Sequence, residues 1–303
     1  MRALVIGGNG FIGSGLVLAL RARGVEVAVL DPGRPRIDVD WAGIEFIAGS
    51  LADAAVTARA LAGVDVVFHL AGTTVPGTSN LDPVADVQGN LVATLGLLGE
   101  MRAAGVRRIV YFSSGGTVYG NPGVSPVPES HPLHPISSYG VVKVAIENYL
   151  HMYQQLGDID PVVLRPSNPY GPRQSTAGIQ GAVAAFLGAA ARGEPVRIWG
   201  DGEVVRDYLY IDDLVDLAAT AGLSQVTGVF NVGSGEGHSL NAMCTLISGV
   251  IGRPLAIEYL PGRAFDVRRV VLDVSAAREA FGWSPRTPLA DGLARAWRSI
   301  QSV

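Results

Sequence analysis

The sequence predicts an α/β protein that combines a doubly wound parallel sheet with a smaller mixed C-terminal lobe. Three observations lead to this prediction. Short apolar runs alternate with longer stretches whose apolar residues recur at helical spacing. The short runs are continuously apolar, as in strands that are buried on both faces of a parallel sheet. A glycine-rich turn directly follows the first of these runs.

The expected strands contain β-branched residues and span 3–7, 26–31, 44–49, 64–71, 107–114 and 160–166. The expected helices between them span 14–24, 54–63, 90–105 and 138–157, and several end in glycine, which stops helices. Beyond residue 166 prolines and glycines become frequent, so a more irregular region is expected. We therefore expect a Rossmann-type dinucleotide-binding domain over 1–166 and a lobe over 167–303, some of whose segments return to the first domain.

Composition restricts the class of protein. Of 303 residues, 48% are apolar and 17% are charged, which suits a well-buried core. The net charge is −4 without a basic run, so neither nucleic acid nor a membrane surface is an expected partner. The first residues reach glycines too early for a signal peptide, and the longest apolar run, 182–191, is about half a membrane span. The one cysteine, Cys244, forms no internal disulfide, and a cytoplasmic location is expected.

Gly7, Gly10 and Gly13 lie between the first expected strand and the first expected helix. Glycine lets the backbone turn tightly and approach a pyrophosphate, while the helix N-terminus offers free N–H donors and a positive dipole. This position predicts a dinucleotide site.

Asp31 ends the second expected strand, 18 residues beyond Gly13. A carboxylate there accepts hydrogen bonds from both ribose hydroxyls and repels a 2′-phosphate, so NAD is favoured over NADP. The alternative is that Asp31 only caps a helix. Arg34 and Arg36 lie nearby and keep NADP open.

Tyr139 and Lys143 are four residues apart on an expected helix and therefore share one face. The chain has 22 arginines but a single lysine, so this position requires an ammonium group in particular. A cation within about 4–6 Å lowers the pKa of a tyrosine by roughly 1–3 units. We therefore expect Tyr139 to act as a general base and Lys143 to assist it.

Together with these residues, eight ordered motifs resemble the extended short-chain dehydrogenase/reductase family: HLAG (69–72), VQGNLVATLGLL (87–98), VYG (118–120), YGVVK (139–143), LRPSNPYGPRQ (164–174), WGDGEVVRDYLYIDD (199–213), FNVGSGE (230–236) and the pair Arg263 and Asp266. Within that family the chain is most similar to the nucleotide-sugar epimerases and dehydratases, especially the UDP-hexose 4-epimerases. The resemblance runs nearly from end to end.

The resemblance implies NAD-dependent epimerisation at C4 of a nucleotide-linked hexose, of the UDP-glucose and UDP-galactose type, through a transient 4-keto sugar. Two alternatives stay open: a reductase of nucleotide-linked 4-keto sugars, and a non-catalytic dinucleotide-binding regulator. Gly116 and Thr117 replace the Asp-Glu pair that is typical of 4,6-dehydratases, so dehydration is not expected. The resemblance also implies a homodimer that pairs through the helices at 86–104 and 138–156.

The resemblance assigns further residues to two ligands. The expected cofactor contacts, besides those above, are Phe11, Ile12, Ser50, Leu51, Leu70, Ala71, Gly72, Asn90, Ser113 and Pro166. Ser50 replaces the usual aspartate, and Ala93 replaces a frequent glycine. The expected substrate contacts are Thr78, Asn168, Trp199, Arg206, Arg263 and Val270, with Ser79 as a weaker candidate and Trp199 equally interpretable as a core residue.

Two of these substrate contacts carry specific expectations. The two arginines are expected to clamp the diphosphate, and Val270 to leave room at C2 of the sugar. His69 is interpreted as a structural histidine, and neither the histidines nor Cys244 have the spacing of a metal site.

One position departs from the family pattern in the catalytic centre. The family places Ser or Thr three residues before the valine of VYG, where its hydroxyl relays a proton to the tyrosine, but here that residue is Gly115. We expect Thr117 to replace it, with Ser114 as the second candidate. The alternative is that both hydroxyls only bind local backbone and Tyr139 acts alone.

Overall fold

The computed structural model describes residues 1–33, 39–176, 181–262 and 267–301. The chain folds into two compact units. Unit 1 comprises residues 1–118, 135–165 and 215–230, and unit 2 comprises 119–134, 166–214 and 231–303. The domain bounds expected from the sequence, 1–166 and 167–303, stay a prediction.

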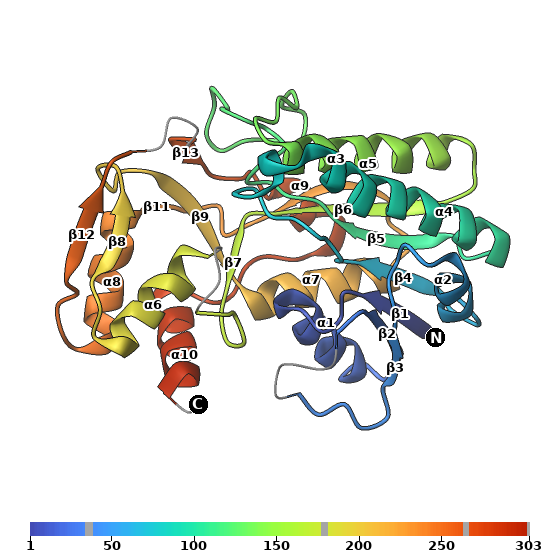
Figure 1. The fold of residues 1–303 in the computed structure, drawn as a ribbon, viewed down its shortest axis with the longest axis horizontal. Coiled ribbons are helices and arrows are strands. Elements are labelled where there is room, and N and C mark those ends of the chain that lie inside the picture. Colours follow the sequence, from blue (N-terminus) through green and yellow to red (C-terminus); the bar gives the residue numbers. More distant parts are fainter. Residues whose placement is uncertain (34–38, 177–180, 263–266, 302–303) are drawn as a thin grey trace. The chain divides into compact units, whose positions relative to one another are not determined.

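A seven-stranded sheet forms the centre of unit 1 (Figure 1). Its order is β10-β6-β5-β4-β1-β2-β3, and the five strand pairs from β6 to β3 are parallel. The strands are β1 (Arg2–Ile6), β2 (Glu26–Asp31), β3 (Glu45–Ala48), β4 (Val66–His69), β5 (Arg108–Phe112), β6 (Asp160–Pro166) and β10 (Gly228–Val232). The chain order reverses between β1 and β4, which is where doubly wound sheets bind ligands. The α/β prediction is confirmed.

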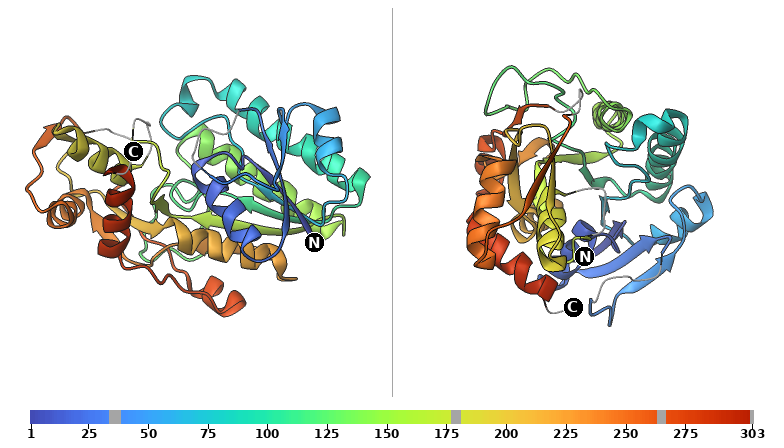
Figure 2. Two further views of the ribbon diagram at one scale, coloured as in Figure 1. Left: turned by 90° about the horizontal axis from the view of Figure 1, so that it is seen from below. Right: turned by 60° about the vertical axis from the view of Figure 1, so that its left-hand side comes forward.

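Helices cover both faces of this sheet because the central positions of most of its strands are apolar and buried. On one face α4 (Ala93–Ala104) and α5 (Ser138–Gln155) lie side by side (Figures 1 and 2). Leu97, Met101 and Ile146 from these helices are buried in one cluster with Leu4 and Tyr111 of the sheet. The helix α7 (Ile211–Leu223) lies on the other face. It packs closely on the sheet, since a Cβ on Gly222 would come within 2.2 Å of the Phe68 ring. The remaining helices of unit 1 are α1 (Phe11–Arg21), α2 (Ala54–Ala60), η1 (Ser79–Leu81) and α3 (Pro83–Asp86).

The starts of two helices differ from the sequence prediction. The helix expected at 14–24 begins at Phe11, because Gly10 already has the extended conformation of an N-cap. The stretch expected to begin at residue 90 starts inside η2 (Val87–Val92), a π-helix that leads into α4. Such bulges are frequent at functional sites and have no simple sequence signature.

Unit 2 is built on a four-stranded sheet with the order β11-β9-β13, in which β7 also pairs with β9. These strands are β7 (Asn168–Tyr170), β9 (Val205–Tyr210), β11 (Gly237–Ser239) and β13 (Arg269–Val270). A second sheet pairs β8 (Val196–Trp199) with β12 (Ile257–Leu260). The helices are α6 (Ala182–Arg192), α8 (Leu240–Ile251), α9 (Ser275–Phe281) and α10 (Leu289–Gln301). Within the described residues, each helix is too short or too polar to cross a membrane.

Candidate active site

The glycine turn after β1 has no room for side chains. Gly7 has φ +84°, and a Cβ on it would lie 2.9 Å from the backbone nitrogen of Ala71. A Cβ on Gly13 would lie 2.2 Å from the carbonyl oxygen of Gly7. Gly10 caps α1 without a side-chain hydrogen bond, and the first turn of α1 has no acidic residue. The turn therefore matches the close backbone approach and the free N–H donors that a pyrophosphate needs.

Asp31 lies at the end of β2, beside this turn. One carboxylate oxygen accepts a hydrogen bond from the Asn9 N–H at 3.3 Å, and the other accepts one from the Gly33 N–H at 3.0 Å. These bonds fix the carboxylate next to the glycine turn and leave each oxygen able to accept a ribose hydroxyl. Asp31 caps a local turn rather than a helix. Arg34 and Arg36 lie outside the described residues.

The other expected cofactor contacts lie at strand ends, at the start of α1 and in η2. Phe11 and Ile12 begin α1, where both are half-buried. Leu70, Ala71 and Gly72 follow β4, Ser50 and Leu51 follow β3, and Pro166 ends β6. The Asn90 amide nitrogen donates to Thr73, Thr74 and Asp86, and its oxygen accepts from the Thr73 N–H, so this side chain holds the 73–74 loop against η2.

Tyr139 and Lys143 share one face of α5, as predicted. The Lys143 Nζ lies 5.4 Å from the centre of the Tyr139 ring and donates to the Phe112 carbonyl at 2.8 Å. The expected lowering of the tyrosine pKa is wrong for this structure. Burial, reinforced by the Asp86 carboxylate, raises the pKa of Tyr139 to about 12. Burial also lowers the pKa of Lys143 to about 8, although the carboxylates of Glu147 and Asp86 oppose this shift.

Two aromatic side chains lie behind Lys143. The Lys143 Nζ is 4.8 Å from the centre of the Tyr111 ring, and the ring of His69 is 5.5 Å from that of Tyr111. His69 Nε2 bonds to Thr94 Oγ1 at 2.9 Å, whereas His69 Nδ1 and the Tyr111 hydroxyl are buried without a partner. Burial first, and Lys143 second, lower the pKa of His69 to about 3. His69 is therefore a neutral core residue, as interpreted, but its hydrogen bonding is only half satisfied.

The hydroxyl-rich segment after β5 forms a turn in which the Thr117 and Val118 N–H groups donate to the Ser114 carbonyl. This turn packs against α5 next to Tyr139. The packing is so close that a Cβ on Gly140 would lie 3.0 Å from the Thr117 carbonyl oxygen. Ser114 and Thr117 are half-buried, while Gly115 is buried. The Thr117 hydroxyl approaches the Ser114 carbonyl only at 3.5 Å, so it is not tightly bound to the backbone.

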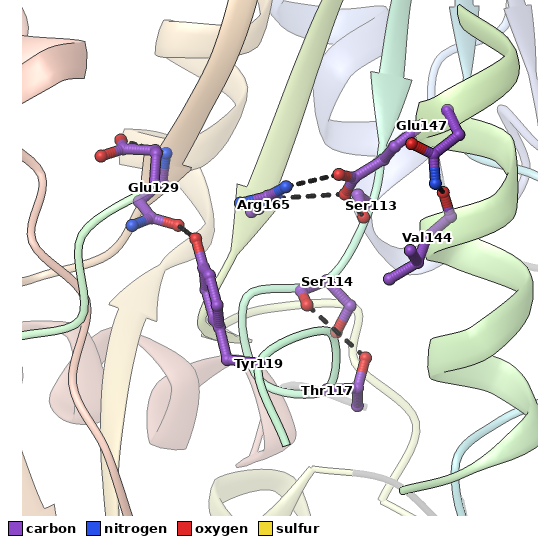
Figure 3. A network of polar contacts seen from close by, with 10 residues as sticks. Ser113, Ser114, Thr117, Tyr119, Glu129, Val144, Glu147 and Arg165 are labelled. Carbon is purple, nitrogen blue, oxygen red and sulfur yellow. Dashed lines mark hydrogen bonds and ion pairs between the residues drawn. The ribbon is translucent and has the colours of Figure 1, made fainter. Parts of the chain in front are cut away.

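Sequence reasoning missed a buried polar network beside Ser113 (Figure 3). The Ser113 hydroxyl donates to Glu147 Oε1, and Arg165 binds the Glu147 carboxylate through Nε at 3.1 Å and Nη2 at 2.5 Å. Expected as a cofactor contact, Ser113 thus directs its hydroxyl proton to Glu147. The available signal was an acidic residue four positions beyond Lys143 on the same helix face.

A second missed group holds the beginning of α5. The Ser79 hydroxyl accepts from the Tyr139 N–H at 3.1 Å, and Asp86 accepts from the Ser138 hydroxyl at 2.6 Å. Ser79 is buried and anchors the backbone of Tyr139, and its interpretation as a sugar contact stays a prediction. Thr78, in the turn just before η1, is half-buried. Its expected contact with the substrate stays a prediction.

In unit 2 the centre of the polar interior is Asp207. Its carboxylate accepts from the Ser234 N–H at 2.7 Å and hydroxyl at 2.8 Å, from the Gly235 and Leu272 N–H groups, and from the Ser167 hydroxyl. The Asp207 carbonyl accepts from the Asn168 amide at 2.9 Å. Asp207 thereby connects the loops that flank Arg206.

Three further expected substrate residues of unit 2 lie on strands. Arg206 lies on β9 with its guanidinium donating to the Val205 carbonyl at 2.9 Å. Val270 pairs with Arg206 in the sheet and is 1% exposed, and its place at C2 of the sugar stays a prediction. Trp199 ends β8 and is 40% exposed, so its interpretation as a core residue is not supported. Arg263, like Asp266, lies outside the described residues.

Other reactive groups have structural environments. The tyrosine of the VYG motif, Tyr119, is buried and donates to Asn231 Oδ1 at 2.7 Å (Figure 3). Burial raises the pKa of the Cys244 thiol to about 11, so it is not a reactive thiolate. In the part of the chain that the structure describes, no group of three His, Cys, Asp or Glu residues is placed to hold a metal ion.

Comparison with known proteins gives consistent matches over the whole chain. The model of the NAD dependent epimerase/dehydratase family matches residues 3–233. A UDP-glucose 4-epimerase from Mycolicibacterium smegmatis is 42% identical over 303 aligned residues, which cover 97% of each chain.

Two crystal structures are also similar. A UDP-glucose 4-epimerase from Thermotoga maritima, solved with UDP-glucose, has a TM-score of 0.96 and 36% identity and covers 100% of this chain and 99% of that one. The enzyme from Thermus thermophilus, solved with NAD, has a TM-score of 0.93 and 36% identity with full coverage of both chains.

Proposed function

This chain belongs to the NAD-dependent epimerase/dehydratase family, and we propose that it epimerises C4 of a UDP-linked hexose of the glucose and galactose type. The single observation that carries this proposal is the Tyr139–Lys143 pair on one face of α5, at the end of a sheet whose glycine turn fits a dinucleotide. A non-catalytic regulator has no need for such a pair. Relatives that act on UDP-glucose support the nucleotide and the sugar class.

The residues of unit 1 hold the cofactor and move the proton. Gly7, Gly10 and Gly13 let the backbone approach the pyrophosphate, and Asp31 accepts the hydroxyls of the adenosine ribose. NAD bound there accepts a hydride from C4 of the sugar and returns it. Tyr139 takes the proton of the 4-hydroxyl as that carbon is oxidised and gives it back as the carbon is reduced.

Lys143 and the turn at 114–118 support the tyrosine. The Lys143 ammonium stabilises the negative charge that develops on the phenol, which burial alone would oppose. Thr117 passes the proton between the 4-oxygen and Tyr139, with Ser114 as the second candidate. The close packing of their turn on Gly140 supports this assignment, because it brings the turn next to the base.

The residues of unit 2 bind the nucleotide and the diphosphate. Arg206 and Arg263 bind phosphate oxygens by charge-assisted hydrogen bonds, and Asn168 binds on the phosphate side. Trp199 stacks on the nucleoside base, which its exposed ring supports. Val270 borders C2 of the sugar, and Thr78 of unit 1 contacts sugar hydroxyls.

We propose further that two copies of the chain pair through α4 and α5. Exposed apolar side chains form one stripe along α5, at Val141, Tyr149, Met152 and Leu156. Such a stripe is stabilised by burial against a second copy. A cytoplasmic location is proposed on the single, buried cysteine, which suits a reducing compartment.

The test is turnover of UDP-galactose by the purified protein without added cofactor. We expect UDP-glucose to accumulate to equilibrium, and NAD to be released when the protein is denatured. Conversion of a 4-keto sugar with stoichiometric consumption of NADPH, and none of UDP-galactose, would establish the reductase instead. Protein that purifies without dinucleotide and converts neither substrate would leave the regulator as the better proposal.

A further inference from the structure

Two side chains one turn apart on α5 bind two consecutive residues at the end of β5. The Lys143 Nζ donates to the Phe112 carbonyl at 2.8 Å, and Glu147 accepts from the Ser113 hydroxyl. Because residues four apart on a helix lie on one face, Tyr139, Lys143 and Glu147 follow each other along the same side of α5. The end of the strand is thus fixed to the helix at two adjacent points.

The Glu147 carboxylate is held from behind by a buried ion pair (Figure 3). Both oxygens accept from Arg165, and the side chains of Glu147 and Arg165 are only 6% and 5% exposed. The charge-assisted hydrogen bonds from the guanidinium offset the cost of burying this carboxylate. Ser113 and Arg165 both hold the Glu147 carboxylate in place. Its negative charge therefore has a fixed position relative to α5 and the end of β5.

Lys143 needs a nearby negative charge because it is buried. The rings of Tyr111 and Tyr139 have their centres 4.8 and 5.4 Å from its ammonium, and the neutral His69 and the carboxylates of Asp86 and Glu147 interact with it electrostatically. Burial lowers the pKa of Lys143 to about 8, and the largest opposing influence is Glu147. The phenol rings add a weaker cation–π attraction.

We propose that Glu147 is a positioning residue of the catalytic pair, whose carboxylate, fixed by Arg165 and Ser113, keeps the buried Lys143 ammonium protonated. The inference rests on the proposed function for its catalytic meaning, because it assigns a role beside the Tyr139–Lys143 pair. Its physical content is independent of turnover.

The chain offers an unusually direct measurement, because it contains a single lysine. Protein labelled with ¹³C at the lysine ε-carbon therefore gives one lysine ε-methylene signal, whose shift against pH reports the protonation of Lys143. The titration is run on the protein as purified, with all variants in the same cofactor state. We expect a midpoint near the wild-type pKa of about 8.

Three variants separate charge from hydrogen bonding. Glu147→Gln keeps the shape of the side chain and removes its charge, so the Lys143 pKa is expected to fall by about one unit or more. Ser113→Ala removes one hydrogen bond and keeps the charge, so the pKa is expected to stay at the wild-type value. Glu279→Gln, an exposed change on α9, is the matched control and is also expected to leave it unchanged.

Activity provides a second reading in the same variants. The basic limb of the kcat/KM profile is expected to move to lower pH in Glu147→Gln by the same amount as the Lys143 titration. A merely structural ion pair would lower activity at all pH values without moving this limb.

A double variant keeps the inference testable if Glu147→Gln fails to fold. Breaking a buried pair on one side leaves an unpaired charge, whereas Glu147→Leu with Arg165→Met replaces both charges by apolar groups and is better tolerated. The Lys143 pKa is expected to fall in this variant too.

An unchanged Lys143 pKa in folded Glu147→Gln or in the double variant would overturn the inference. An equal fall in Ser113→Ala would also overturn it, because the charge is intact there. If the wild-type protein fails to epimerise UDP-galactose while the Lys143 titration shifts as expected, the proposed function fails and the electrostatic inference stands.

Discussion

Each unit has a deeply buried carboxylate, and the two are satisfied in opposite ways. Glu147 in unit 1 is paired with the Arg165 guanidinium beside Lys143. Among the described residues, Asp207 in unit 2 instead accepts only from backbone N–H groups and serine hydroxyls. Burial raises the pKa of Asp207, and the N–H donors oppose that shift. The Glu147 carboxylate influences the protonation of Lys143 beside it. The Asp207 carboxylate instead holds three loops in place. Substitutions in unit 1 should therefore change the chemistry and its pH dependence, and those around Asp207 should change binding and stability.

The largest effect is expected for Tyr139→Phe, because it removes the group that we propose as the base. We expect kcat to fall toward the upper end of the roughly 10²–10⁴-fold range of positioned proton transfer, with NAD still bound. The measurement is the rate of UDP-galactose conversion, with released NAD as the check on cofactor binding. Tyr149→Phe, on the exposed side of the same helix, should keep nearly full activity. Equal activity of both variants would remove Tyr139 from the mechanism.

The next effect concerns the hydroxyl that replaces the missing one at Gly115. Thr117→Val should lower kcat by about 10²-fold or more, because it removes the proton relay and keeps the shape. Ser114→Ala should cost less, since its carbonyl rather than its hydroxyl organises the turn. Steady-state kinetics at one pH decide between them. A collapse in Ser114→Ala with Thr117→Val near wild type would assign the relay to Ser114.

In unit 2, Asp207→Asn should change binding rather than the pH profile. The new amide NH₂ faces hydroxyl or backbone donors that now lack an acceptor, which costs about 1–3 kcal/mol of unfolding free energy. The loops beside Arg206 loosen, so KM for UDP-galactose should rise more than kcat falls. Urea unfolding and substrate titration measure the two effects, with the exposed Asp291→Asn as control. A shifted pH profile with unchanged KM would contradict the contrast between the two units.

The last effect, which is confined to acid conditions and does not touch the chemistry, is a pH dependence of stability at His69. Burial lowers its folded pKa to about 3, from 6.5 in the unfolded chain, so the folded state binds fewer protons between these values. Stability must then fall as the pH drops from 6.5 toward 3, by at most about 1.4 kcal/mol per pH unit. His69→Gln should remove this contribution, and His151→Gln, on the surface of α5, should keep it. Urea titrations at several pH values measure the unfolding free energy. If it fell equally with pH in wild type and His69→Gln, the assigned contribution of His69 would be contradicted.

The fold was predictable because its signals are local. The runs at 26–31 and 160–166 are strands with these bounds, and the glycine turn lies where its position after β1 indicated. The π-helix at Val87–Val92 was not predictable, because its wide turn depends on contacts such as those of Asn90 with the 73–74 loop.

The proximity of Tyr139 and Lys143 was predictable from spacing, but the surroundings of the two side chains were not. Spacing places Lys143 beside Tyr139, yet the sign of the tyrosine pKa shift depends on burial and on Asp86, which lies 53 positions before it in the chain. The link between Ser113, Glu147 and Arg165 likewise joins a strand end, a helix and another strand. Such contacts follow from the sheet order rather than from any local pattern.

Epimerisation through a 4-keto sugar is tested most directly with UDP-galactose that carries deuterium at C4. The purified protein, in ordinary water and without added cofactor, is expected to form UDP-glucose that retains the deuterium at C4, since the hydrogen removed from that carbon returns to it. Nuclear magnetic resonance of the product locates the label. Loss of the deuterium to water, or the absence of any UDP-glucose, would contradict the proposed reaction.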